Sequence, residues 1–314
     1  MTVLLLHLAV LALLAGLQFV VPPFQHSLLV RLMILAAYAA GYNVLLGYAG
    51  LMSLGHALFF ATGMYATGLT IFYLHAGAPL AFVIGVAASL SLTAVFGVLA
   101  LRATGVAFLI VTMMFAQVGY LVAIYFNQIT GGDQGLVLAG RVPPIHLSGL
   151  LLPLDDPAVR YNAALAVLAV ALLLNLWLTR TPAGRVLRAL RGDEERVKLL
   201  GYNTFHYRLL ALVLSGGISG MAGSAYALLF SYVGASFVST LYSIYPLVST
   251  LLGGVGTTLG PLVGASFMTY VVDIASSVTP GYLIVLGVTL VTVIRWAPDG
   301  ILGRVRARWV RWLP

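Results

Sequence analysis

The chain has 314 residues, of which 61% are hydrophobic and 8% are charged, and its mean hydropathy is +1.05. A soluble domain of this length could not cover its surface with so few polar side chains, so the composition excludes a soluble protein and predicts a multi-pass membrane protein. Eleven of the sixteen Lys and Arg residues lie at 180–208 and 304–312, so the net charge of +8 reflects positive-inside topology rather than nucleic-acid binding.

Apolar segments long enough to cross a bilayer, which takes about twenty residues, follow one another along the chain. The first has no basic residue before Arg31, which predicts a membrane helix rather than a signal peptide. Reading the hydrophobic windows in order, we predict spans at 2–21, 27–46, 51–74, 79–101, 105–129, 159–179, 209–231, 240–274 and 281–297.

The segment 240–274 is too long for one straight span. It contains LLGGVGTTLGP (251–261), and glycine tolerates the interruption of a helix inside a membrane. We therefore expect two segments or half-helices, joined at a break made of Gly253, Gly254, Gly256, Gly260 and Pro261. The predicted fold is an all-α, polytopic membrane helical bundle in one domain over 1–314, with about nine to ten transmembrane segments that include broken or half helices.

A second helix break is expected at Ser53 and Gly55, inside GLMSLGHALFFATG (50–63). Free backbone groups in such a break can meet a polar solute, so this segment is the candidate translocation pathway. His56 would face the passage, and Asn43 is a further candidate. The alternative for both side chains is a hydrogen bond to a neighbouring helix, as polar groups in membrane proteins make.

The charges predict the orientation of the loops. The segment 180–208, the tail 304–311 and Arg102 are expected on the cytoplasmic side, which places the loop 130–158 outside. This outer loop is rich in Gly and Pro and is expected to include a short surface or re-entrant helix. It is the face expected to meet an external partner or substrate.

The charged island 180–208 reads RTPAGRVLRALRGDEERVKLLGYNTFHYR. Thr181 and Pro182 are typical of an N-cap and a first helical turn, and Gly192 ends the pattern. The intervening residues predict a short amphipathic helix with one apolar and one basic face, formed by Val186, Leu187 and Leu190 and by Arg185, Arg188 and Arg191.

A second short helix is expected to follow in the island. Asp193 can cap it, Glu194 and Lys198 have the i,i+4 spacing of an ion pair, and Gly201 can end it in the left-handed conformation. Two interpretations stay open. The helices dock into a cleft of a soluble partner, or the island is a solvated basic loop that rests on anionic lipid.

No energy source for transport is recognisable in the sequence. A nucleotide-binding P-loop needs Gly-Lys-Ser/Thr, and the single lysine, Lys198, stands between Val197 and Leu199. Asp273 is the one acidic residue inside an apolar span, and its place near the end favours a helix cap over a proton relay. The absence of cysteine and the scatter of the six histidines predict no metal site. We expect no cofactor in this chain and energy supplied by another subunit.

Four ordered motifs resemble the permeases of branched-chain amino acid ABC importers, specifically the LivM-type subunit. They are GYNVLLGYAGLMSLGHALFFATGMYA (41–66), TGGDQGL (130–136), GRVLRALRGDEERVKLLGYNTFHYRLLALVLSGGISGMAGSAYA (184–227) and LLGGVGTTLGPLVGA (251–265). The family usually has a small or polar residue and then an acidic or amide residue after the paired glycines. Asp133-Gln134 departs from this pattern, which weakens inference about the solute.

The resemblance implies an assembly in the cell inner (plasma) membrane. Its other parts are a second, LivH-like permease, two cytoplasmic ATPase subunits that bind ATP and Mg, and a periplasmic or lipid-anchored substrate-binding protein. It also implies that the island is the coupling element, with ATPase contacts or loop-shaping residues at Arg185, Arg188, Ala189, Glu195, Gly201 and Asn203. The binding protein would dock on the outer loops at Gly131, Gly132 and Asp133.

The resulting hypothesis is a transport subunit rather than an enzyme. It would move branched-chain or related aliphatic amino acids inward by ATP-driven alternating access. One alternative is an ABC permease for urea, amides or short carboxylic acids. Another is a secondary carrier or channel that works without ATP.

Overall fold

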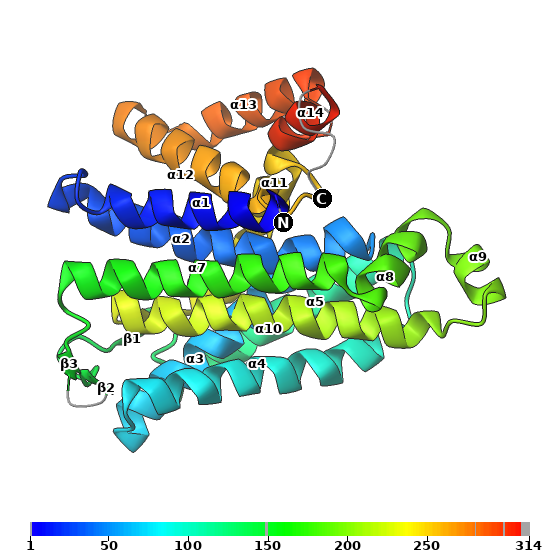
Figure 1. Ribbon diagram of the computed structural model, residues 1–314. Helices are drawn as coiled ribbons and strands as arrows, with labels where there is room; N and C mark the ends of the chain where they lie inside the picture. The colour runs from blue at the N-terminus through cyan, green and yellow to red at the C-terminus, as the bar shows by residue number, and fades with distance from the viewer. Residues whose placement is uncertain (1, 148–149, 280, 298, 309–314) are drawn as a thin grey trace.

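The computed structural model describes residues 2–147, 150–279, 281–297 and 299–308, and 79% of it is helical, which confirms the predicted polytopic helical bundle. The longer helices run roughly parallel, and α11 to α14 gather on one side of them (Figure 1). The helices are α1 (Thr2–Leu17), α2 (Pro23–Asn43), η1 (Val44–Tyr48), α3 (His56–Leu74), α4 (Ala78–Ala100), α5 (Val106–Tyr125), α6 (Asn127–Thr130), α7 (Pro157–Arg180), α8 (Pro182–Gly192), α9 (Glu194–Leu199), α10 (Thr204–Phe230), η2 (Ala235–Val238), α11 (Thr240–Gly253), α12 (Gly260–Val278), α13 (Tyr282–Trp296) and α14 (Ile301–Arg308).

Within the described residues, seven helices are long and apolar enough to cross a membrane. They are α2 with η1, α3, α4, α5, α7, α10 and α12. Helices α1, α11 and α13 are apolar but have only 16, 14 and 15 residues. At 1.5 Å per residue α11 is about 21 Å long, shorter than the roughly 30 Å hydrocarbon core, so it has the length of a half-helix. Seven spanning helices among the described residues are fewer than the nine to ten predicted, because these three apolar helices are shorter than the sequence windows suggested.

Helix α10 lies at the centre of the bundle, with α2, α3 and α4 against it (Figure 1). Glycines let these helices approach closely. A Cβ at Gly63 would lie 2.1 Å from the carbonyl oxygen of Gly220, and one at Gly223 would lie 1.9 Å from that of Phe60. Such distances exclude any side chain, so α3 and α10 pack backbone to backbone, as small residues allow in membrane bundles.

Two helix breaks meet inside the bundle. Helix α2 runs into the π-helical turn η1, and α3 begins only at His56, so the predicted span 51–74 starts five residues too early. The segment 240–274 is divided as expected, because α11 ends at Gly253 and α12 begins at Gly260. Each break contains a glycine with positive φ, 70° at Gly50 and 124° at Gly254, a conformation that favours glycine.

The outer loop differs from the prediction. Its described residues contain three short strands, one of which pairs with a strand that follows α10, in place of the expected surface or re-entrant helix. Strand β1 (Leu136–Val137) pairs with β4 (Tyr232–Val233), and β2 (Ile145–Leu147) pairs with β3 (Leu150–Leu152), both antiparallel. The loop could not continue as a helix because four of its glycines have positive φ: Gly131, Gly132, Gly135 and Gly140.

Candidate functional site

The charged island forms the two short helices that its sequence predicts. The Thr181 hydroxyl accepts a hydrogen bond from the Gly184 amide at 3.2 Å, which caps α8. The Asp193 carboxylate accepts one from the Arg196 amide at 3.1 Å, which caps α9. Gly201 follows α9 with φ of 84°. The two helices project from one end of the bundle (Figure 1), as a protruding cytoplasmic element would.

The apolar face of the island anchors it to the bundle. Leu187 and Leu190 on α8 and Val197 on α9 are buried, and Val186 is partly buried. Packing of this face fixes the direction in which the opposite face points. The amphipathic pattern therefore positions a surface rather than a flexible loop.

The basic face of α8 divides into two groups. Arg188 donates to the Thr179 carbonyl at 2.9 Å, and Arg191 donates to the Gly47 carbonyl at 2.6 Å. Arg185 is exposed and has no side-chain hydrogen bond within the described chain. All three arginines lie on the exposed face opposite the buried leucines, as predicted, and two of their guanidinium groups also bond to carbonyls at helix ends.

Arg191 joins the island to both helix breaks. Its guanidinium bonds to Gly47 in η1, the turn that continues α2, and lies 3.0 Å from where a Cβ of Gly256 would be. Its side chain also lies against Gly50. A cavity of about 340 Å³ opens between these segments, lined by Gly47, Tyr48, Thr179, Arg188, Arg191, Gly192, Val255 and Gly256. Sequence reasoning did not single out Arg191 as a site residue, although its spacing of three from Arg188 placed both on one helix face.

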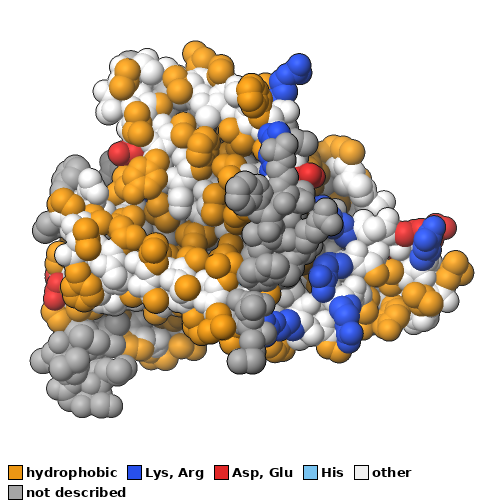
Figure 2. All heavy atoms as spheres, turned by 45° about the horizontal axis from the view of Figure 1, so that its top comes forward, with side chains coloured by type: hydrophobic (Ala, Val, Ile, Leu, Met, Phe, Trp, Pro, Cys, Tyr) orange, Lys and Arg blue, Asp and Glu red, His pale blue; other side chains and the backbone are white. Residues whose placement is uncertain are grey.

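The island also carries an exposed apolar surface. Leu199 and Leu200 are 87% and 74% exposed, and Tyr202 is 44% exposed. Charged side chains gather beside hydrophobic ones at this projecting end (Figure 2). Exposed apolar groups rimmed by charge are typical of a protein-binding surface. The sequence-predicted contact residues that lie exposed there are Arg185, Arg188, Ala189, Glu195, Gly201 and Asn203.

Glu194, rather than Glu195, is the carboxylate that holds the island together. It pairs with Lys198 at 3.0 Å and with Arg208 on α10, and it accepts a hydrogen bond from Thr204 at 3.2 Å. Desolvation alone would raise the pKa of Glu194, but the Lys198 hydrogen bond and the Arg208 charge outweigh it and lower the pKa. Asn203 contributes locally, because its side-chain oxygen caps α10.

Replacing Glu194 by Gln is expected to loosen α9 from α10 by roughly 1 to 2 kcal/mol, because charge-assisted bonds are lost in a partly exposed site. Because the pKa of Glu194 is lower in the folded chain, its ionised carboxylate stabilises the fold at pH values above the unfolded-state pKa near 4.5. This stabilisation is lost as the pH falls through the folded-state pKa. Amide hydrogen exchange over 194–204 should therefore be faster in the variant at pH 7. The difference from wild type should vanish in acid. Glu195→Gln is the control and should exchange like wild type, and a faster exchange in it would contradict the assignment.

One of the predicted pathway residues, Asn43, joins the two helix breaks, and the others bond elsewhere. Asn43 donates to the Thr257 carbonyl at 3.0 Å and accepts from the Gly256 amide at 2.9 Å. The Ser53 hydroxyl accepts from the Gly55 amide at 3.1 Å, and the ring of His56 bonds to Ser215 on α10 at 2.7 Å. The side chains of Asn43, Ser53 and His56 are fully buried. Asn43 and His56 thus act as hydrogen-bonding contacts between separate segments of the bundle, whereas the Ser53 hydroxyl bonds within its own turn.

The predicted binding-protein side is a well-ordered turn. The Thr130 hydroxyl bonds to the Ala123 carbonyl at 2.6 Å and accepts from the Gly132 amide at 3.2 Å. Gly131 has φ of 77°, and a Cβ there would lie 2.4 Å from the Gly135 carbonyl oxygen. Asp133 is exposed. The turn therefore presents this carboxylate at the protein surface.

Comparisons with known proteins agree with the motifs. The family model described as the permease component of branched-chain amino acid transport systems matches residues 25–294. The high-affinity branched-chain amino acid transport system permease protein LivM of Salmonella typhimurium is 28% identical over 299 residues, which cover 87% of this chain and 69% of LivM. LivH of Escherichia coli is 25% identical over 139 residues, covering 42% and 44% of the two chains. The autoinducer 2 import system permease protein LsrC of Salmonella typhimurium is 30% identical over 110 residues, covering 33% and 31%. No solved structure matches.

Proposed function

This chain belongs to the family of permease components of branched-chain amino acid transport systems, and from that membership we propose that it is the LivM-like subunit of an ABC importer in a bacterial or archaeal inner membrane. Its solutes would be branched-chain or related aliphatic amino acids. The names of LivM and LivH support this choice, since both are permeases of one high-affinity system. A LivH-like chain would be the second permease, which makes the pair a heterodimer.

The observation that carries the proposal is the direct bond between the island and the helix breaks. Two ATPase subunits would hold the exposed surface of α8 and α9, and ATP would draw them together. Because Arg191 bonds to Gly47 and lies beside Gly256, a displacement of α8 acts on α2 and on the α11–α12 break together. The breaks would then convert motion of the ATPases into opening of the pathway. ATP and Mg²⁺ would be bound by the ATPases, with no cofactor in this chain.

The outer side would receive the substrate. A periplasmic or lipid-anchored binding protein would dock on the turn with Gly131, Gly132 and Asp133 and release the solute between the two permeases. Asn43, Ser53, Gly55 and His56 would act as a gate, whose hydrogen bonds change partners when the breaks move. Their present burial supports a closed gate. No tight site in the membrane is required, because affinity resides in the binding protein.

A second substrate class is favoured by the similarity to LsrC, whose name gives autoinducer 2 as its solute. Members of one family therefore serve chemically different solutes, and urea, amides or short carboxylic acids stay as alternatives. A carrier without ATP is the rival mechanism. It offers no reason for the projecting island or for its exposed leucines.

The docking claim predicts that Leu199→Asp with Leu200→Asp releases the ATPases. The aspartates replace exposed apolar anchors with charge, and loss of such anchors weakens an interface by about 2 kcal/mol or more each. The test is to purify the tagged chain from its native membrane and quantify the copurified ATP-binding subunits. Val137→Asp on the outer loop is the control, because Val137 is also exposed, at 61%. Equal recovery of ATPases with the double variant and the control would rule out docking through this surface.

A further inference from the structure

An apolar cavity lies between three helices, at the end of the bundle opposite the island. It has a volume of about 330 Å³ and is lined by residues of α4, α7 and α10 and by Leu154, which precedes α7. Helices α4 and α7 lie on either side of α10 (Figure 1), and both pack against it. Ala225, Leu228 and Leu229 of α10 are buried, whereas Val83 on α4 is 62% exposed. The cavity is therefore a groove with α10 as its floor, open to the surroundings of the bundle.

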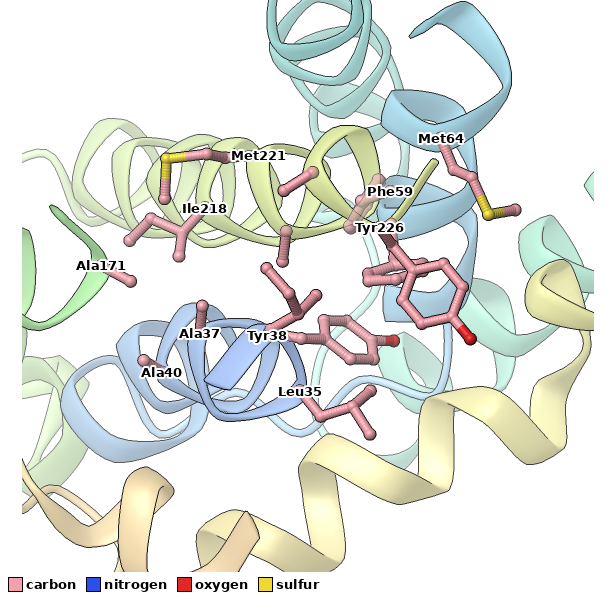
Figure 3. Close-up of a cluster of buried hydrophobic side chains, with 14 of the residues drawn as sticks. Leu35, Ala37, Tyr38, Ala40, Phe59, Met64, Ala171, Ile218, Met221 and Tyr226 are labelled. Carbon is pink, nitrogen blue, oxygen red and sulfur yellow. The ribbon is translucent and has the colours of Figure 1, made fainter. Parts of the chain in front are cut away.

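The register of α7 against α10 explains why this groove forms. Further along the same interface, Ile218 and Met221 of α10 lie beside Ala171 of α7 in the buried core (Figure 3). Seven residues after Ile218, the same face of α10 carries Ala225, and eight residues before Ala171, the same face of α7 carries Ala163. Alanine thus replaces isoleucine on α10 while α7 keeps an alanine, and the two short side chains leave space between the helices.

The lining of the groove decides which chemistry can fill it. All ten residues that line it have apolar side chains. A buried water needs about two to four polar partners, so water is not stabilised there. A space without atoms would cost its walls their dispersion contacts. Helices α4 and α7 are long and apolar enough to span a membrane, so the molecules beside the groove are lipids. A hydrocarbon chain is therefore the occupant that the lining favours.

A charged pair stands at one end of the groove. Arg160 lies one turn before Ala163 on the same face of α7, and its Nε donates to the carbonyl of Leu154, a lining residue, at 2.6 Å. Its Nη2 also pairs with the carboxylate of Asp155 at 3.3 Å. These bonds use two of the five N–H donors of a guanidinium, and the Asp155 side chain is 88% exposed. Each group can therefore bind a further group of opposite charge.

We infer that the groove binds an acyl chain of a zwitterionic phospholipid whose headgroup carries a phosphate and a primary ammonium, as phosphatidylethanolamine does. The phosphate accepts hydrogen bonds from Arg160, and the ammonium donates to Asp155. Phosphatidylglycerol, whose headgroup has no cation, offers Asp155 no partner. Arg160 lies only about 4.5 Å along the helix axis from Pro157, the first residue of α7, and long basic side chains near helix ends reach the membrane surface. The inference holds whichever solute the chain transports.

The test is native mass spectrometry of the whole copurified complex. The complex is stripped of lipid in detergent and then supplied with phosphatidylethanolamine or phosphatidylglycerol of the same chain length. Wild type should retain phosphatidylethanolamine in preference. Ala163→Leu fills the groove and should retain less of both lipids, whereas Ala166→Leu, exposed on the same helix outside the lining, should behave like wild type. Arg160→Gln should weaken binding about 3- to 10-fold, the value of a charge-assisted bond in a partly exposed site, and Arg102→Gln is its control.

Asp155→Asn tests the headgroup separately from the groove. Without this carboxylate the ammonium loses its partner, so the preference for phosphatidylethanolamine over phosphatidylglycerol should disappear. Asp133→Asn, which is exposed on the same outer loop, should keep the wild-type preference. An equal change in the retention of both lipids would make Asp155 a structural residue and would overturn the headgroup assignment.

Three further results would overturn the inference. The first is equal lipid retention by wild type and Ala163→Leu. The second is a wild-type preference for phosphatidylglycerol. The third is loss of the second permease from the Ala163→Leu complex, because the groove would then be an interface between permeases. Arg160→Gln and Asp155→Asn do not change the side chains that line the groove, so they test the headgroup even if Ala163→Leu fails to assemble.

Discussion

Replacing Arg191 by Ala is expected to lower ATP-driven uptake about 10- to 100-fold, because one charge-assisted hydrogen bond of roughly 1.5 to 3 kcal/mol joins the coupling helix to the breaks. The ATPases should stay bound, since the exposed surface with Leu199 and Leu200 is untouched. ATP hydrolysis should then continue while uptake falls, so the number of ATP molecules used per solute rises. Uptake and hydrolysis measured on the same proteoliposomes give this ratio directly.

A conservative variant distinguishes a loss of coupling between the island and the breaks from a loss of folding. Arg191→Lys can still donate one hydrogen bond to the Gly47 carbonyl and should recover part of the uptake. Arg102→Ala removes another exposed arginine, between α4 and α5, and is expected to behave like wild type. If Arg191→Ala keeps the wild-type ratio of hydrolysis to uptake, the island does not act on the breaks through this residue.

Replacing Asn43 by Ala is expected to destabilise the fold strongly, because this one side chain bonds the end of α2 to the α11–α12 break. It bonds to the partly buried Gly256 amide and to the buried Thr257 carbonyl, and removing it leaves both without that partner. An unsatisfied buried group costs about 1 to 3 kcal/mol, and the amide that the cavity opens to costs less, so the total loss is roughly 2 to 4 kcal/mol. Thermal unfolding of the chain in lipid nanodiscs should show a correspondingly lower midpoint.

A matched asparagine on another helix provides the control for this prediction. Asn162 is exposed on α7 and bonds only to the Ala158 carbonyl one turn away, at 2.8 Å. Asn162→Ala should therefore leave the unfolding midpoint almost unchanged. Equal midpoints for the two variants would show that the Asn43 contacts do not hold the breaks together.

The parts of the fold that the sequence predicts well depend on local signals. The ends of α8 and α9 follow from Thr181, Asp193 and Gly201, whose effects act within one helical turn. The division between α11 and α12 follows from the glycines at 253–260. Both predictions need only neighbours in the chain, so they hold before any tertiary contact is known.

The contacts that connect the island to the helix breaks join residues that are far apart in the sequence. Arg191 and Gly47 are 144 positions apart, and Asn43 and Thr257 are 214 apart. No sequence pattern within one helix shows which arginine of an amphipathic face bonds to a free carbonyl. The same holds for the outer loop, where β1 pairs with β4, a strand that follows it in the sequence only after α7 to α10.

The roles of the two acidic residues in α9 likewise depend on tertiary contacts that the sequence does not reveal. Glu194 and Glu195 are adjacent, and the resemblance to known permeases favoured Glu195. Burial decides between them, because the side chain of Glu194 is 25% exposed between Lys198 and Arg208, whereas Glu195 faces outward. Glu195 therefore stays a candidate contact for an ATPase, and Glu194 is the residue that positions it.

Uptake into proteoliposomes tests most directly whether this chain is the permease subunit of an ATP-driven importer. Proteoliposomes are prepared from the complex that copurifies with the tagged chain, with its binding protein on the outer-loop side. Uptake of labelled leucine is then followed with ATP, or with a non-hydrolysable analogue, on the island side. We expect uptake only with ATP and the binding protein together. Equal uptake without ATP would contradict the claim and make the chain a secondary carrier or channel.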